Sequence, residues 1–71
     1  MAIHFKNGVI GKIYKDHNPP HIHLYKAGLE QRVNLTNGQT LEPKQKEFKE
    51  ALHEITTNQE YFLKLWEQKN K

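Results

Sequence analysis

The sequence predicts an α+β fold: a small antiparallel sheet of about four strands, made of two β-hairpins, followed by two C-terminal α-helices packed on one face of the sheet. Two observations indicate this fold. In the first half, turn signals such as Asn-Gly separate short runs of β-branched and aromatic residues. After Leu41 the apolar residues recur at three- and four-residue spacing, which is typical of helices. The 71 residues allow one small domain, spanning 1–71.

The first predicted hairpin lies between Ile3 and Tyr14. Its two strands meet at Asn7-Gly8, a pair that favours tight hairpin turns. The segment 16–20 that follows ends in two prolines. Each proline removes a backbone donor and holds the preceding residue extended, so we expect a stiff connector here.

The second predicted hairpin begins at His21 and alternates in polarity. In its first strand Ile22 and Leu24 share one face, and the other face holds His21, His23 and Tyr25. A partner strand follows the turn Ala27-Gly28, and the resulting register pairs Tyr25 with Glu30, Leu24 with Gln31, His23 with Arg32, Ile22 with Val33, and His21 with Asn34. Alanine suits this turn poorly if the position requires a positive φ.

Two helices are predicted after the turn at Asn37-Gly38. Pro43 suits the first position of the first helix, whose apolar stripe comprises Phe48, Ala51, Leu52 and Ile55. The sequence Thr57-Asn58-Gln59-Glu60 matches a capping box and predicts the start of the second helix, with a stripe of Phe62, Leu65 and Trp66.

Composition narrows the classes of function. The chain has no cysteine, which excludes disulfides and thiolate metal sites. It has neither a long apolar run nor an export leader, so we expect a cytoplasmic protein without a membrane span. The formal charge of +3 is compatible with RNA, DNA or an acidic protein as partner.

The histidines of the segment 17–23 form the candidate site. Two histidines at i and i+2 on a strand lie about 6.5 to 7 Å apart on one face, close enough to flank one reacting group or to share a metal ion. For phosphodiester cleavage, histidine transfers protons and a cation stabilises the charge on the phosphate. The candidate catalytic residues are therefore His17, His21, His23 and Arg32, and the candidate substrate-binding residues are Lys12, Lys15, Tyr25 and Asn34.

Two other interpretations fit the same residues. His17, His21 and His23 could together hold a divalent metal such as zinc; otherwise no cofactor is expected. Alternatively, the histidine face is a solvated polar surface or an interface for another protein, and the small core also leaves room for a homodimer.

The stretch Tyr14-Lys15-Asp16-His17-Asn18-Pro19-Pro20-His21-Ile22-His23 resembles the signature of the small bacterial domain-of-unknown-function family 4160. The resemblance extends more loosely through the preceding strand to the C-terminal helix bearing Trp66. It implies a bacterial or phage protein encoded beside a second small protein, in the manner of a toxin-antitoxin module. We therefore expect a small toxin-antitoxin-like protein that acts on RNA, or alternatively a protein-protein interaction module of the antitoxin or inhibitor kind.

Overall fold

The computed structural model describes residues 2–15 and 19–70. The strands in this part are β1 (Ala2–His4), β2 (Ile10–Lys12), β3 (His21–Lys26) and β4 (Leu29–Asn34). The α-helices are α1 (Lys49–Thr57) and α2 (Gln59–Lys69), and short 3-10 helices span Lys6–Gly8 and Lys46–Phe48. No helix in the described ranges is long and apolar enough to cross a membrane.

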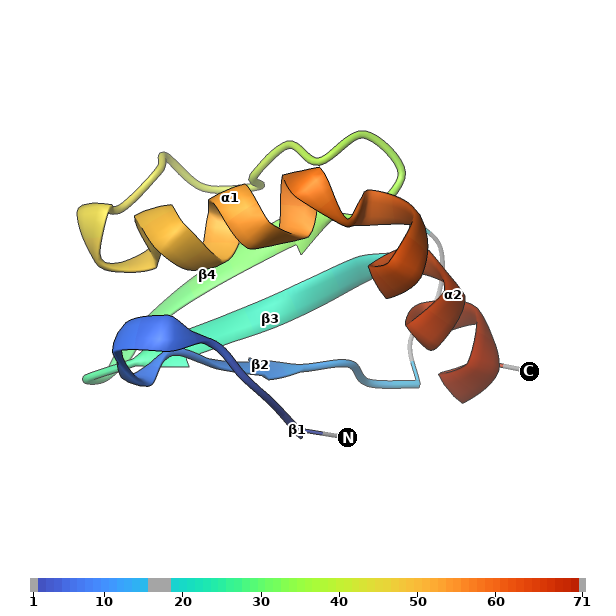
Figure 1. Cartoon of the computed structure of the whole chain (residues 1–71), viewed down its shortest axis with the longest axis horizontal. Helices are drawn as coiled ribbons and strands as arrows, with labels where there is room; N and C mark the ends of the chain where they lie inside the picture. Colours follow the sequence, from blue (N-terminus) through green and yellow to red (C-terminus); the bar gives the residue numbers. More distant parts are fainter. Residues whose placement is uncertain (1, 16–18, 71) are drawn as a thin grey trace.

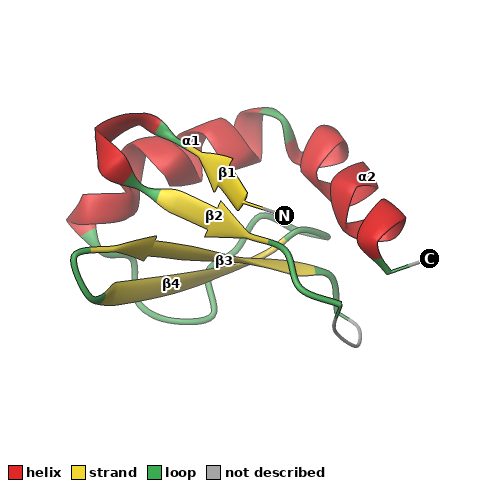
Figure 2. Ribbon diagram, turned by 90° about the horizontal axis from the view of Figure 1, so that it is seen from below, coloured by secondary structure: helices red, strands yellow, loops and turns green. Residues whose placement is uncertain are grey.

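The strands form one antiparallel sheet in the order β1-β2-β3-β4, and both α-helices lie on the same side of it (Figure 1). Figure 2 shows the molecule from below, with the sheet in front of α1. This confirms the predicted fold. The register of β3 with β4 is also the predicted one, from the pair His21 and Asn34 to the pair Tyr25 and Glu30.

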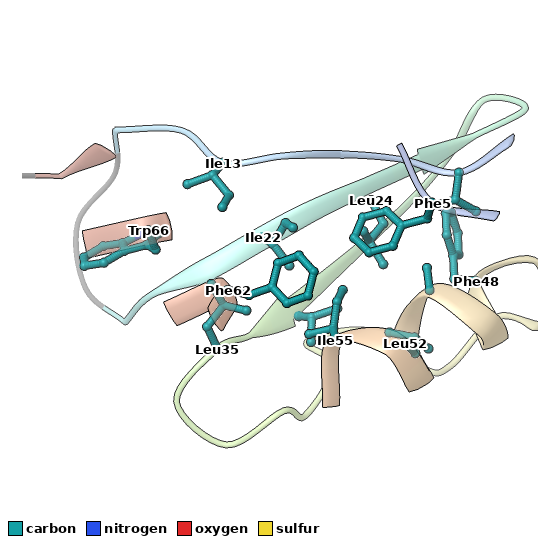
Figure 3. Packing of buried hydrophobic residues seen from close by; sticks show 13 residues of the cluster. Phe5, Ile13, Ile22, Leu24, Leu35, Phe48, Leu52, Ile55, Phe62 and Trp66 are labelled. Carbon is teal, nitrogen blue, oxygen red and sulfur yellow. The ribbon is translucent and has the colours of Figure 1, made fainter. Parts of the chain in front are cut away.

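The buried apolar side chains gather between the sheet and the helices (Figure 3). The sheet contributes Ile22 and Leu24 from β3, and α1 contributes Ile55, all three fully buried. Trp66 of α2 covers the end of the core nearest the start of β3, and Phe62 lies further inside, stacked on Phe5 with ring centroids 5.7 Å apart (Figure 3). The alternation of β3 therefore buries its apolar face and turns its histidines to the side without helices.

The two helices begin differently from the sequence prediction. Pro43 is not helical, and α1 begins only at Lys49, because the preceding segment is engaged along the edge of β4. The predicted capping box does not form either: Thr57 is the last residue of α1, and Asn58 at the start of α2 makes no side-chain cap. The Asn58 side chain instead donates to the carbonyl of Glu54. Both predicted helices are present, but the predicted start of each is wrong.

Residues 39–45, which we call the edge segment, follow the outer edge of β4. The N–H of Asn34 donates to the carbonyl of Gln39 (2.8 Å). The N–H of Leu41 donates to the carbonyl of Arg32 (3.0 Å), and the Arg32 N–H donates to Oε1 of Glu42 (2.9 Å). An open strand edge is a template for unwanted pairing, and the edge segment occupies it.

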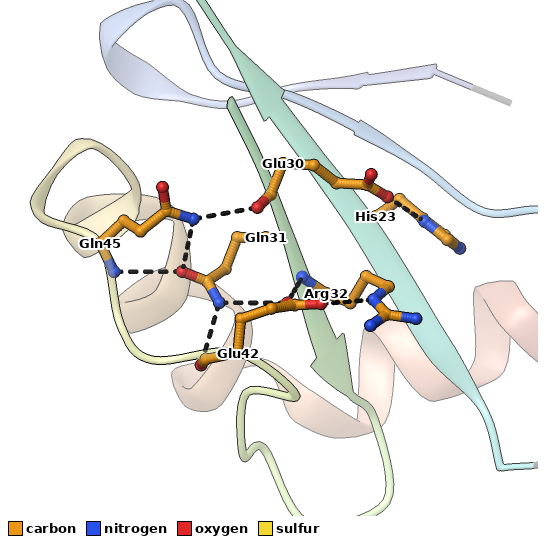
Figure 4. A network of polar contacts seen from close by, with 6 residues as sticks. All are labelled: His23, Glu30, Gln31, Arg32, Glu42 and Gln45. Atoms are coloured by element: carbon orange, nitrogen blue, oxygen red, sulfur yellow. Dashed lines mark hydrogen bonds and ion pairs between the residues drawn. The ribbon is translucent and has the colours of Figure 1, made fainter. Parts of the chain in front are cut away.

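Gln31 anchors the edge segment to the sheet and is fully buried (Figure 4). Its Oε1 accepts from the backbone N–H of Gln45 (3.1 Å), and its Nε2 donates to the carbonyl of Glu42 (3.2 Å). A buried amide is costly unless both ends are paired, and here both are. Gln31 thus fixes the edge segment beside β4.

The turn Ala27-Gly28 lies in the left-handed region, with φ of 49° at Ala27 and 79° at Gly28. Alanine is strained there and glycine is not. We expect Ala27→Gly to raise the free energy of unfolding by about 0.5 to 1 kcal/mol, the relieved strain exceeding the added freedom of the unfolded chain. Urea denaturation measures this, with Ala51→Gly in α1 as a control that must destabilise. A loss of stability in Ala27→Gly would contradict the strained turn.

Candidate functional site

The face of the sheet that carries no helix holds the candidate site. β3 contributes His21, His23 and Tyr25 to this face, because successive side chains of a strand point to opposite sides. Lys12 of β2 lies opposite His23, and Arg32 of β4 lies opposite it on the other side. The structure therefore brings together five of the residues predicted from sequence.

His23 lies at the centre of this face and is oriented by Glu30. Its Nδ1 is 2.7 Å from Oε2 of Glu30 (Figure 4). A carboxylate only accepts, so Nδ1 carries the proton and the lone pair of the neutral ring is on Nε2. The His23 side chain is 15% exposed and its Nε2 is buried. The carboxylate of Glu30 therefore holds the His23 ring in one orientation and one tautomer.

A backbone carbonyl orients the His21 ring in the same way, by accepting a hydrogen bond from its Nδ1. Its Nδ1 is 2.8 Å from the carbonyl oxygen of Pro19, which can only accept. The neutral ring of His21 therefore also has its lone pair on Nε2. The rings of His21 and His23 are tilted against each other with centroids 4.9 Å apart. Two imidazoles with the same tautomer thus lie in contact.

Two tyrosines flank the histidine pair. The ring of Tyr14 meets the ring of His23 edge-on, with centroids 4.8 Å apart, and the ring of Tyr25 is parallel to it at 6.3 Å. The two phenol oxygens are 3.0 Å apart. The hydrogen bond to Tyr14, burial and the charge of Glu30 together raise the pKa of Tyr25. Tyr25 therefore stays a neutral phenol at physiological pH and is not a base.

The two cationic residues of this face, Lys12 and Arg32, make different contacts. Lys12 places its Nζ 5.8 Å from the centroid of the Tyr25 ring, a weak cation–π contact. Arg32 is tied to Glu42 through its Nε (Figure 4), an ion pair that does not involve its two terminal amino groups. The Arg32 side chain is 44% exposed and can still present those groups to an anion.

The residues described so far form the histidine cluster, which comprises Lys12, Tyr14, His21, His23, Tyr25, Glu30 and Arg32. The other residues predicted for the site lie outside this cluster or have a different role. Lys15 is exposed in the connector after β2. The side-chain oxygen of Asn34 accepts from the N–H of Thr36 (2.7 Å), so it serves the turn after β4. His17 lies outside the described residues, so the predicted third histidine has no position here.

Two residues of the cluster were not assigned to the site from sequence. Glu30 was predicted to lie opposite Tyr25, and its position two residues before Arg32 puts it diagonally opposite His23, within reach of a long side chain. The predicted register thus allowed a pair of His23 and Glu30 but did not select it. Tyr14 joins the cluster from beyond the end of β2, and it was missed because the pairing of β2 with β3 was not predicted.

Glu42 gives the site region a pH-dependent stability. Burial works to raise its pKa, but the backbone N–H and guanidinium of Arg32 and the amide of Gln31 outweigh it, so the pKa is lowered. A lowered pKa means that the charged form stabilises the fold above the ordinary value of 4.5, and that this stability is lost as pH falls through the folded-state pKa.

We therefore expect Glu42→Gln to lower the free energy of unfolding by about 1 to 2 kcal/mol at pH 7, a value limited by the partial exposure of the ion pair. The difference from wild type should shrink as the pH falls below about 4. Chemical denaturation across pH measures both, and a difference that stays constant down to pH 3 would show that the charge of Glu42 is irrelevant.

The histidine pair supplies only part of a metal site. The described residues include no group of three or more His, Asp or Glu placed to hold one. His21 and His23 nevertheless have the arrangement common in metal sites, in which Nδ1 donates to an oxygen and Nε2 faces the metal. The tautomers of His21 and His23 therefore suit metal ligation, although Nε2 of His23 is buried, and the third expected ligand, His17, is outside the described part of the chain.

Comparison with known proteins identifies one family. Residues 8–67 match the family model described as Domain of unknown function (DUF4160). No curated protein and no solved structure shows significant similarity to the chain. The match covers the histidine face, most of the sheet, all of α1 and most of α2. The chain therefore belongs to the DUF4160 family, as the resemblance of its histidine segment implied.

Proposed function

We propose that this protein acts on single-stranded RNA, as the toxin-like member of a pair of small proteins, and that His21 and His23 transfer the protons. The observation that carries the proposal is the 2.7 Å pairing of His23 with Glu30 beside a second oriented histidine. A carboxylate behind an imidazole stabilises the imidazolium that forms when the ring takes a proton. The pair is thus suited to general-base chemistry.

The reaction that fits these groups is transesterification within the RNA strand. His23 takes the proton of a ribose 2′-hydroxyl, and the 2′-oxygen attacks the adjacent phosphorus. The bond from phosphorus to the 5′-oxygen breaks, and protonated His21 gives its proton to that oxygen. The terminal amino groups of Arg32 and the Nζ of Lys12 stabilise the additional negative charge on the phosphate. The products are a 2′,3′-cyclic phosphate and a 5′-hydroxyl.

The aromatic rings indicate why the substrate would be single-stranded. Tyr14 is 40% exposed, and its ring can stack on an unpaired base, whereas a paired base is already stacked in its helix. Because Nε2 of His23 is buried, a side chain must move before a substrate reaches it. Tyr14, whose ring lies edge-on to His23, is the candidate among the described residues.

The test is cleavage of a panel of labelled RNAs by purified, untagged protein. We expect His21→Ala/His23→Ala to lower the cleavage rate by at least about 100-fold, since each acid or base contributes 10² or more. The matched control is His4→Ala/His53→Ala, which removes two exposed histidines outside the cluster and should cleave normally. No cleavage by the wild type, or equal cleavage by both variants, would refute the nuclease; the first result would favour a module that binds a cognate protein through this face.

A divalent metal such as zinc is the second candidate, favoured by the shared tautomer of His21 and His23. Bound there, the metal would supply a Lewis acid or an activated water. A chelator added to half the reactions distinguishes the two chemistries, because proton transfer by histidines alone survives it. Untagged protein that carries no stoichiometric metal and gains no thermal stability from added zinc would exclude the metal site.

A further inference from the structure

A second site lies on the opposite side of the edge segment from the histidine face. A cavity of about 570 Å³ separates the edge segment from α1. This volume is in the range of pockets for small molecules. Its wall on the helix side is a single face of α1, formed by Lys49, Leu52, His53 and Thr56 at spacings of three and four residues. None of the residues of the histidine cluster lines it.

The cavity concentrates positive charge. Lys44, Lys46 and Lys49 line it, and among the described residues no Asp or Glu does. The three positive charges of these lysines equal the formal net charge of +3 of the entire chain. The positive and negative charges of the remaining residues therefore cancel. The neighbouring groove on α1 shares Lys49 but differs in charge, because Glu50 and Glu54 accompany Lys6 and Lys49 there. The charge in the cavity is therefore a local feature and not the average of a basic surface.

The walls of the cavity are held in place before any ligand arrives. Gln45 is fixed by Gln31 and also donates its Nε2 to the carbonyl of Glu30 (2.9 Å). At the other end, Nε2 of Gln59 donates to the carbonyl of Thr36 (2.6 Å) and ties the turn before the edge segment to α2. A site whose walls are already ordered loses less entropy when a ligand binds.

We propose that this cavity binds a small molecule bearing two adjacent phosphates, such as a nucleoside diphosphate. Three lysine ammonium groups can compensate the two to three negative charges of a diphosphate, and Leu52 offers an apolar wall to the group that bears it. Lys44 approaches from the edge segment, Lys46 from the 3-10 helix that follows it and Lys49 from α1, so the phosphates would bridge these elements. This binding does not depend on any reaction at the histidine face.

The test is an NMR titration of ¹⁵N-labelled full-length protein with three probes: inorganic pyrophosphate, ADP and adenosine. We expect pyrophosphate and ADP to shift the amides of residues 44–49 and adenosine to leave them unchanged. ADP binding more tightly than pyrophosphate would identify a nucleoside diphosphate, and equal affinity would identify the diphosphate alone as the recognised group. The spectrum also reports that each variant is folded.

The matched variants remove two positive charges each. Lys46→Gln/Lys49→Gln should weaken pyrophosphate binding by about tenfold or more, because charge-assisted contacts are lost. Lys64→Gln/Lys69→Gln, on the exposed face of α2, should change it by less than about threefold. The proposal is overturned if millimolar pyrophosphate shifts no amide of residues 44–49, if both variants weaken binding equally, or if the shifts centre on His21 and His23.

Discussion

Replacing Gly11 with valine is expected to lower the free energy of unfolding by about 3 kcal/mol, which is most of the stability of a domain this small. Gly11 lies at the centre of β2 and faces the core. A Cβ at this position would lie 2.7 Å from Cε2 of Phe5 and 3.1 Å from Cδ1 of Ile22. Phe5 is itself buried against the core, so its ring has little room to retreat. Urea denaturation followed by circular dichroism measures the effect.

The matched control is Lys12→Val, which places the same side chain one position along β2 on the face without helices. We expect this variant to remain within about 1 kcal/mol of wild type, because valine favours strands and enters no packed space. Equal stability of Gly11→Val and wild type would show that the core opposite Gly11 is not close-packed.

Replacing Glu30 with glutamine is expected to lower the turnover of RNA by about 10- to 100-fold, with little change in KM. The glutamine keeps an oxygen for the Nδ1–H of His23 but removes the charge that stabilises the imidazolium. Glu30 is a positioning residue, because it acts through His23. The carbonyl of Glu30 would still accept from Gln45, so the edge segment should stay in place.

Two further measurements separate this role from a structural one. The midpoint of urea denaturation of Glu30→Gln should stay close to wild type, since the Glu30 side chain is 46% exposed. Glu30→Asp, which restores the charge on a shorter side chain, should recover part of the turnover. If KM rises and kcat is unchanged, Glu30 contacts substrate and does not orient His23.

Local patterns were sufficient to predict the sheet and the register of its second hairpin. The alternation in 21–26 and the turn Ala27-Gly28 left one pairing that put apolar residues together, and the structure has that pairing. The helix starts were predicted less well because Pro43 and Thr57 match start signals that many loops also contain. What decides the first helix is Gln31, which holds the preceding segment against β4. That long-range contact leaves no periodic trace in the sequence.

The candidate site was predicted only in part, because one of its contacts also depends on a residue far along the chain. The spacing of His21 and His23 on a strand fixes a shared face, and the neighbouring strand adds Arg32 at a known position. The partner of His23 could not be chosen from the face alone, because Arg32 is directly opposite and Glu30 is diagonal. The choice depends on Glu42, which engages Arg32 and lies ten residues further along the chain.

The chemistry of the RNA ends tests the central claim most directly. Untagged wild-type protein is incubated with labelled single-stranded RNA in the presence of a chelator, and the termini of the products are analysed. Acid–base catalysis by His21 and His23 predicts 2′,3′-cyclic phosphate and 5′-hydroxyl ends that are absent with His21→Ala/His23→Ala. Products with 3′-hydroxyl and 5′-phosphate ends that the chelator abolishes, or no products at all, would contradict it.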